Sequence, residues 1–302
     1  MPTSPRDVEF QTLDGLTIRG ALYAAPTRGP AAIITPGFNC VKEMFVPEVA
    51  EQFQLAGITA LIYDPRNLGL SDGEPRNEVD PMKQVSDYSD ALTYLRTLPE
   101  VDPDKIIFWG QSFAGCVALC AGALDKRARM VVSICPLLDF ELTPEKFPKV
   151  LAKKDGVNPA GLGIGADKEE FDYMVNAKKY GAARHENRTT LQTYYKLIMW
   201  QPYGIMKYMH QTPVLMVIPE LDQISPPEQQ HSLFSTFPGP KKAHVSIGKG
   251  HLNVLSGPEF PDLIKMQVDF IQDILAGNTE RYITNGYTNG THENYKGDWA
   301  AM

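Results

Sequence analysis

Residues 105–124 read KIIFWGQSFAGCVALCAGAL, and this stretch decides the fold. The apolar run 105–109 predicts a short strand, and the small and apolar residues after the turn predict a helix. The turn holds Ser112, with small residues two before and two after it, Gly110 and Ala114. Such a turn is so sharp that large residues do not fit at those two places, and it presents the serine hydroxyl at the sheet edge. The stretch predicts a nucleophile elbow, although Ala114 stands where the usual motif has glycine.

Ser112 has a plainer alternative role, because serine also favours the N-cap of a helix. The strand before the turn and the candidate partners found later in the chain favour a nucleophile instead. In that arrangement the backbone N–H of Phe113, at the start of the helix, can donate to an oxyanion. We therefore predict Ser112 as the nucleophile and Phe113 as one oxyanion donor.

Strand-like runs alternate with helix-like segments along most of the chain. Besides those at the turn, the predicted strands are 16–24, 31–35, 58–63, 130–134, 214–218 and 244–247, and the predicted helices are 46–55, 84–98, 228–234 and 261–275. This alternation is typical of a mostly parallel sheet with helices on both faces. Such a sheet binds its ligand at the carboxyl ends of its strands.

One long insertion interrupts the alternation. Residues 139–209 contain no convincing strand, and this length far exceeds that of an ordinary connection. Long insertions of this kind often cover active sites, so we predict a helical cap at 139–209 on a core formed by 1–138 and 210–276. Residues 277–302 are polar and rich in Asn, Thr and Gly, which predicts a flexible tail.

The base for Ser112 is expected among the late histidines, because acid and histidine follow the nucleophile in that order. His251 lies in a glycine-containing loop directly after a predicted strand, where its ring can reach the serine. His244 lies inside a predicted strand, His231 inside a predicted helix, and His292 in the tail. We predict His251 as the base, and a histidine on a surface loop is the alternative.

The acid that orients this histidine should follow the preceding strand, 214–218. Glu220 and Asp222 are both available there. We favour Asp222, because an Asp followed four residues later by proline, here Pro226, is the common form of this loop. Glu220 is the alternative.

A second oxyanion donor should come from the loop after an early strand. Pro36 and Gly37 follow the predicted strand 31–35, and the glycine lets the backbone turn toward a substrate. We predict the N–H of Phe38 as this donor. A plain Pro-Gly turn is the alternative.

These segments together resemble the α/β-hydrolase superfamily. The resemblance rests on four stretches, at 36–38, 64–71, 110–115 and 250–251. Two longer motifs, PGFNCVKE at 36–43 and DPRNLGLSDGEPR at 64–76, are similar to those of the fungal polyketide transferase and thiohydrolase family of secondary-metabolite pathways. The resemblance extends over residues 8–276.

The resemblance implies an α/β-hydrolase fold and a serine acyl-enzyme catalyst. The substrate would be a small-molecule acyl chain presented as a thioester by an acyl-carrier protein of a polyketide synthase. The chain would pass to water, to an alcohol, or to its own hydroxyl as a macrolactone. A general small-ester hydrolase and a non-catalytic binding protein are the alternatives. A complete set of nucleophile, base, acid and oxyanion loop argues against the binding protein, which does not need all four.

Aromatic and sulfur-containing side chains crowd the end of the predicted cap. The candidates for lining an apolar acyl pocket are Tyr194, Tyr195, Met199, Trp200 and Tyr203. Helix core is the alternative for such a stripe. Tyr195, Trp200 and Tyr203 are the candidates for closing the cap over a substrate.

Bulk properties disfavour several classes of protein. The net charge of −7 argues against nucleic-acid binding, which calls for a basic patch. No apolar run is long enough to span a membrane, and residues 1–9 lack the apolar core of a signal peptide, so we expect a cytoplasmic protein. The four cysteines show no metal-ligand spacing and are expected to be free thiols. Nothing else in the sequence indicates a metal or an organic cofactor, so none is predicted.

Overall fold

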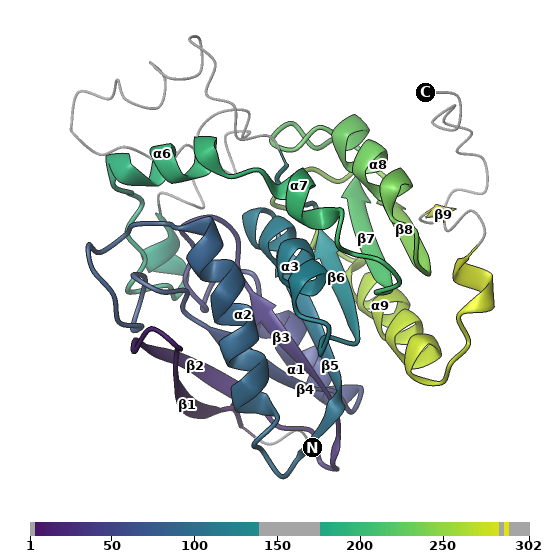
Figure 1. Ribbon diagram of the computed structural model, residues 1–302, viewed down its shortest axis with the longest axis horizontal. Coiled ribbons are helices and arrows are strands. Elements are labelled where there is room, and N and C mark those ends of the chain that lie inside the picture. Colours follow the sequence, from purple (N-terminus) through teal and green to yellow (C-terminus); the bar gives the residue numbers. More distant parts are fainter. Residues whose placement is uncertain (1–3, 139–175, 284–286, 290–302) are drawn as a thin grey trace.

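The structure is a computed structural model that describes residues 4–138, 176–283 and 287–289 (Figure 1). Its strands form one sheet in the order β1-β2-β4-β3-β5-β6-β7-β8-β9. They are β1 (Arg6–Gln11), β2 (Thr17–Tyr23), β3 (Gly29–Thr35), β4 (Thr59–Tyr63), β5 (Val101–Gln111), β6 (Met130–Ile134), β7 (Val214–Pro219), β8 (Lys241–Ser246) and β9 (Tyr287–Asn289). The pairs β1–β2 and β2–β4 are antiparallel, and the others are parallel. The predicted mostly parallel sheet is confirmed.

Helices cover both faces of this sheet (Figure 1). They are α1 (Pro47–Leu55), α2 (Pro81–Leu95), α3 (Phe113–Leu124), α6 (Leu191–Met199), α7 (Pro202–Met206), α8 (Pro227–Thr236) and α9 (Phe260–Leu275). Side chains of α2, α3 and α8 join one apolar cluster, and those of α1 and α9 join a second. Two-sided cover explains why β4, β6 and β7 consist entirely of buried residues. None of these helices is long and apolar enough to cross a membrane.

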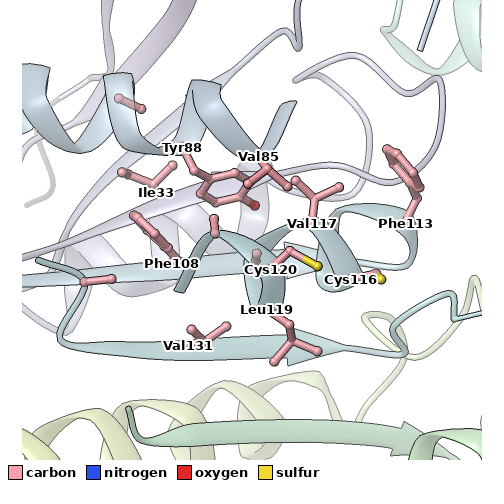
Figure 2. Packing of buried hydrophobic residues seen from close by; sticks show 14 of the residues in the cluster. Ile33, Val85, Tyr88, Phe108, Phe113, Cys116, Val117, Leu119, Cys120 and Val131 are labelled. Carbon is pink, nitrogen blue, oxygen red and sulfur yellow. The ribbon is translucent and has the colours of Figure 1, made fainter. Parts of the chain in front are cut away.

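The core next to the predicted elbow is built from α3 and its neighbours. Figure 2 shows Val117 of α3 near Val85 and Tyr88 of α2, and Leu119 beside Val131 of β6. Fully burying an apolar side chain of this size contributes about 1.5–3 kcal/mol relative to leaving it exposed. This packing holds α3 against the sheet and thereby fixes the turn that joins it to β5.

Two strands differ from the sequence prediction. β1 has one buried residue, Phe10, because it lies at the sheet edge, and its charged neighbours hide the strand pattern. β9 lies within the predicted flexible tail and pairs in parallel with β8. In the same tail, the ring of Tyr282 packs on that of Phe270 with centroids 5.0 Å apart. Within the predicted tail, the described residues therefore contact β8 and α9 at these two places.

Part of the predicted helical cap falls within the described residues. Residues 139–175 lie outside them. Residues 176–209 hold the 3₁₀ turn η1 (Ala177–Tyr180), α6 and α7, and this part contains no strand. Met206 and Met209 join the same apolar cluster as α3, so the end of the predicted cap is packed on the core.

Candidate active site

Ser112 occupies the turn between β5, which ends at Gln111, and α3, which begins at Phe113. Its backbone has φ 58° and ψ −124°, a conformation that residues other than glycine rarely adopt. The Ser112 N–H donates to the Ile134 carbonyl at 2.8 Å, and the Leu137 N–H donates to the Ser112 carbonyl at 3.0 Å. The serine side chain makes no N-cap hydrogen bond, so helix capping does not explain its presence. Backbone strain held in place by its surroundings is typical of functional sites.

Close packing requires small residues around this turn. A Cβ atom at Gly110 would lie 2.0 Å from the carbonyl oxygen of Ala114, and one at Gly115 would lie 2.8 Å from Ser133 Oγ. The methyl group of Ala114, in contrast, is accommodated in the core. Alanine therefore fits where the usual motif has glycine.

A continuous chain of hydrogen bonds joins Ser112, His251 and Asp222, all of them buried. Ser112 Oγ lies 2.6 Å from His251 Nε2, and His251 Nδ1 lies 2.8 Å from Asp222 Oδ2. Because a carboxylate accepts and does not donate, Nδ1 carries the proton and Nε2 accepts from the serine hydroxyl. The three residues follow β5, β7 and β8, whose parallel course brings their carboxyl ends to one edge of the sheet.

Glu220, the alternative acid, makes a different contact. Its Oε2 accepts a hydrogen bond from the Gly248 N–H at 2.8 Å. Asp222 faces the imidazole and also accepts from the N–H groups of Ile224 at 2.9 Å and Ser225 at 2.8 Å. These bonds fix the carboxylate, so the structure brings Asp222 and not Glu220 to the histidine.

The surroundings of His251 favour its charged form. Burial by itself lowers the pKa of His251, but the hydrogen bond to Asp222 and the charge of that carboxylate raise this pKa above its usual value. Burial also raises the pKa of the Cys135 thiol, so that thiol is neutral near pH 7 and Asp222 supplies the charge. The imidazolium that forms when His251 takes a proton is thus stabilised.

Cys135, Asp222 and His251 also place three potential metal-ligand atoms within 4.8 Å of one another. Their hydrogen bonds fit acid–base chemistry better than metal ligation. His251 Nδ1 is already hydrogen-bonded to the Asp222 carboxylate, and Cys135 Sγ donates to the His251 backbone carbonyl at 3.6 Å. A buried thiol with a raised pKa is moreover a poor source of the thiolate that a metal prefers.

The loop after β3 passes directly beside the nucleophile. A Cβ atom at Gly37 would lie 3.2 Å from the Cβ atom of Ser112, so glycine permits the close approach. The ring of Phe38 packs edge to face on that of Phe113, with centroids 5.5 Å apart. The backbone hydrogen bonds of the described loops leave the Phe38 N–H without a carbonyl acceptor. The two residues predicted as oxyanion donors therefore lie together next to Ser112.

Two contacts hold this loop in place. The backbone N–H and the ammonium group of Lys42 donate to the buried carboxylate of Asp64, at 2.8 and 3.1 Å. Asn39, with φ 55°, donates from Nδ2 to the carbonyl oxygen of Glu186 at 2.8 Å. The second contact joins the loop to the described part of the predicted cap.

The family model described as serine aminopeptidase, S33 matches residues 31–252, a range that contains Ser112, Asp222 and His251. The chain belongs to this family of α/β hydrolases. The α/β-hydrolase fold expected from the sequence is thereby confirmed.

Relatives of this S33-family chain include fungal proteins of similar length. It is 58% identical over 291 residues to a thiohydrolase of Eupenicillium brefeldianum, covering 89% of this chain and 94% of that protein. It is 41% identical to the polyketide transferase ATR5 of Stachybotrys chlorohalonatus, covering 89% and 97%. The crystal structure of the α/β hydrolase GrgF from a Penicillium species has a TM-score of 0.81 and 37% identity, covering 91% and 100%. The resemblance to the fungal thiohydrolases and polyketide transferases is confirmed.

The residues predicted to line an acyl pocket in this S33-family chain divide into two groups. Tyr194 and Trp200 are buried, and the Trp200 ring packs edge to face on that of Phe113, with centroids 5.6 Å apart. The other three side chains are exposed: Tyr195 by 65%, Met199 by 67% and Tyr203 by 46%. The structure thus brings Trp200 beside the elbow residue Phe113, whereas Tyr195, Met199 and Tyr203 are exposed, and their part in an acyl pocket stays a prediction.

Gln230 of α8 also belongs to the site, although no motif in the sequence points to it. Its buried side chain donates from Nε2 to Asp222 Oδ2 at 3.2 Å and to the Ser225 carbonyl at 2.7 Å. Ser225 Oγ in turn donates to the Pro136 carbonyl at 2.5 Å, which ties the acid loop to the end of β6. A single glutamine in a predicted helix carries no signal of this role, because the role depends on which face of α8 meets Asp222.

Replacing Gln230 with methionine should keep the side-chain volume and remove the donor to Asp222. We expect kcat to fall about tenfold with little change in KM, since a hydrogen bond to a charged group contributes at least ~1.5 kcal/mol. The carboxylate then attracts the imidazolium proton more strongly, so the pKa of His251 rises further. Because the base acts when neutral, the acid limb of the pH–rate profile should move to higher pH.

The profile of kcat against pH tests this role, with Gln229→Met as the matched control on the same helix. The control should retain the wild-type acid limb. If the Gln230→Met protein is less stable but the acid limb of its kcat profile lies at the wild-type pH, Gln230 stabilises the fold and does not position Asp222.

Proposed function

We propose that this chain is a serine acyl-enzyme catalyst that accepts acyl chains from thioesters. The hydrogen-bonded series Ser112–His251–Asp222 carries the proposal, because all three side chains are buried and joined at 2.6 and 2.8 Å. A serine that merely caps a helix needs neither the histidine nor the acid. This geometry activates a hydroxyl that is otherwise a weak nucleophile.

The reaction begins when Ser112 Oγ attacks the thioester carbonyl and His251 Nε2 takes the hydroxyl proton. The carbonyl oxygen becomes an oxyanion, and the N–H groups of Phe38 and Phe113 are the proposed donors to it. One such donor typically contributes about 10²–10³ in kcat. Collapse of the tetrahedral intermediate breaks the carbon–sulfur bond, and the proton on His251 passes to the leaving thiolate. The acyl chain is then an ester of Ser112.

The relatives support the class of substrate. One is named a thiohydrolase and another a polyketide transferase. We therefore propose a polyketide-type acyl thioester as the substrate, presented by the acyl-carrier protein of a polyketide synthase. The same chemistry would act on a simple ester, so a general small-ester hydrolase remains the second candidate function.

The second half-reaction decides the product. His251 takes a proton from the acceptor, which attacks the acyl-Ser112 carbonyl. The bond from the carbonyl carbon to Ser112 Oγ then breaks, and His251 returns the proton to Oγ as the chain leaves. Water gives the free acid, an alcohol gives an ester, and the chain's own hydroxyl gives a macrolactone. A well-placed internal hydroxyl can reach an effective molarity on the order of 10⁵ M, far above the ~55 M of bulk water. Cyclisation is therefore favoured where the substrate folds its hydroxyl onto the ester and water is excluded.

Intact mass spectrometry with acyl thioesters tests this proposal. Mixing the protein with a short and a long acyl thioester should produce one adduct of the acyl mass, and peptide mapping should place it on Ser112. Product analysis with and without an added alcohol then identifies the acceptor. Rapid turnover of small esters, without an adduct or turnover from thioesters, would favour the small-ester hydrolase instead.

A further inference from the structure

The described part of the predicted cap differs in charge from the chain as a whole. Residues 176–209 contain six basic residues and one acidic residue, whereas the whole chain has a net charge of −7. Lys178, Lys179 and Arg184 are exposed, and none forms an ion pair with a residue that the structure describes. Lys196, in contrast, is paired within the fold. Three cations are therefore available to a partner.

Exposed apolar side chains gather in the same part of the chain. Half of the large apolar side chains that are exposed in the described residues lie within 176–209. Leu191, Tyr195 and Met199 are spaced by four residues and share one face of α6, while Leu197 packs in the core. Gathered exposed apolar groups of this kind mark interaction sites on soluble proteins.

These two features lie close together along the chain. The exposed cations lie in the segment that leads from η1 into α6, between 13 and 7 residues before Leu191, and α6 then presents its apolar face. We call the side chains that combine them the cap surface, and its members are Lys178, Lys179, Arg184, Leu191 and Tyr195. A cationic surface with an apolar margin suits an acidic protein partner, since charge guides the encounter and apolar area supports the contact.

The cap surface is joined to the candidate active site. Glu186, two residues after Arg184, accepts the hydrogen bond from Asn39, which directly follows Phe38. α6 is also fastened to the core, because Thr193 Oγ1 accepts from the backbone N–H of Val79 at 2.9 Å. A partner on this surface would therefore hold its cargo near the oxyanion loop.

We propose that the cap surface docks the acidic protein domain that delivers the acyl thioester. The proposal rests on the proposed function and adds where the carrier binds. The carrier stays outside, and its thioester reaches Ser112 past the loop that contains Phe38. Opposite charges raise the rate of encounter between two such proteins, and salt screens this effect.

An anionic lipid surface is the competing partner for basic and apolar side chains. It is disfavoured because a bilayer extends beyond the protein on all sides and therefore interacts with the net charge of the whole chain. That charge is −7, so anionic lipids repel the protein. A compact acidic domain meets only the local cations.

Charge reversal at the cap surface tests the proposal. Lys179→Glu with Arg184→Glu should lower kcat/KM for an acyl-carrier domain loaded with the acyl thioester about tenfold at low salt. High salt should reduce this difference. The same acyl chain on a small thiol should be turned over as by the wild type. Arg28→Glu with Arg96→Glu is the matched control, because both arginines are exposed, outside the cap, and make the same change in net charge.

The apolar part is tested separately with Leu191→Gln, and Leu55→Gln of α1 is its matched control. Leu191→Gln should likewise impair turnover of the carrier-bound thioester alone. Equal losses on both thioesters, or wild-type turnover of the carrier-bound one, would overturn the docking surface. So would variants that lose binding to vesicles of phosphatidylcholine and phosphatidylglycerol while carrier turnover is unchanged. A wild-type protein that turns over neither thioester would contradict the proposed function itself.

Discussion

Replacing Ser112 with alanine is expected to abolish acyl-thioester turnover and labelling by a fluorophosphonate together. The reagent should label the wild-type protein once, because Ser112 Oγ lies 2.6 Å from the nitrogen that takes its proton. Without that oxygen no acyl-enzyme can form, so we expect a loss of at least about a thousandfold, limited by residual catalysis from the oxyanion donors. Intact mass spectrometry measures the label, and product formation measures the turnover.

A glycine variant separates this chemical role from the backbone of the turn. Ser112→Gly should be as inactive as Ser112→Ala but more stable, by about 1 kcal/mol, since glycine adopts a φ of 58° without strain. Ser256→Ala, at an exposed serine, is the control for labelling. Labelling that persists in both Ser112 variants would move the nucleophile elsewhere.

Replacing Asp222 with asparagine is expected to lower kcat roughly ten thousandfold, as for the acid of serine-protease triads, while the fold stays intact. An amide next to His251 Nδ1 can donate to it and so favours the tautomer that no longer accepts the serine proton at Nε2. The change also removes the charge that raises the pKa of His251. The acid limb of the residual activity should therefore lie at lower pH than that of the wild type, because His251 stays neutral down to a lower pH.

Steady-state kinetics across pH, together with circular dichroism to confirm folding, checks this expectation. Glu220→Gln is the matched control, since it makes the same chemical change in the same loop. Its carboxylate accepts from the Gly248 N–H, so the control should lose little activity. A large loss in Glu220→Gln with near-normal activity in Asp222→Asn would reverse the assignment of the acid.

Much of the architecture was accessible from sequence because its signals are local. Continuous apolar runs predicted β6 and β7, since strands covered on both faces bury every side chain. β1 escaped the same reasoning because an edge strand buries so few side chains. The exposed position of Tyr195 also escaped it, because α6 carries apolar residues on both its buried and its exposed face.

The sequence by itself determined the alternation of strands and helices and the turn at Ser112. These depend on side-chain periodicity and on the steric demands of a few adjacent residues. The tertiary structure alone decided between Asp222 and Glu220, added Gln230 to the site and separated Trp200 from the exposed residues of α6. Those outcomes depend on which groups, distant in sequence, the packed fold brings within a few ångströms of one another, and no local pattern encodes that distance.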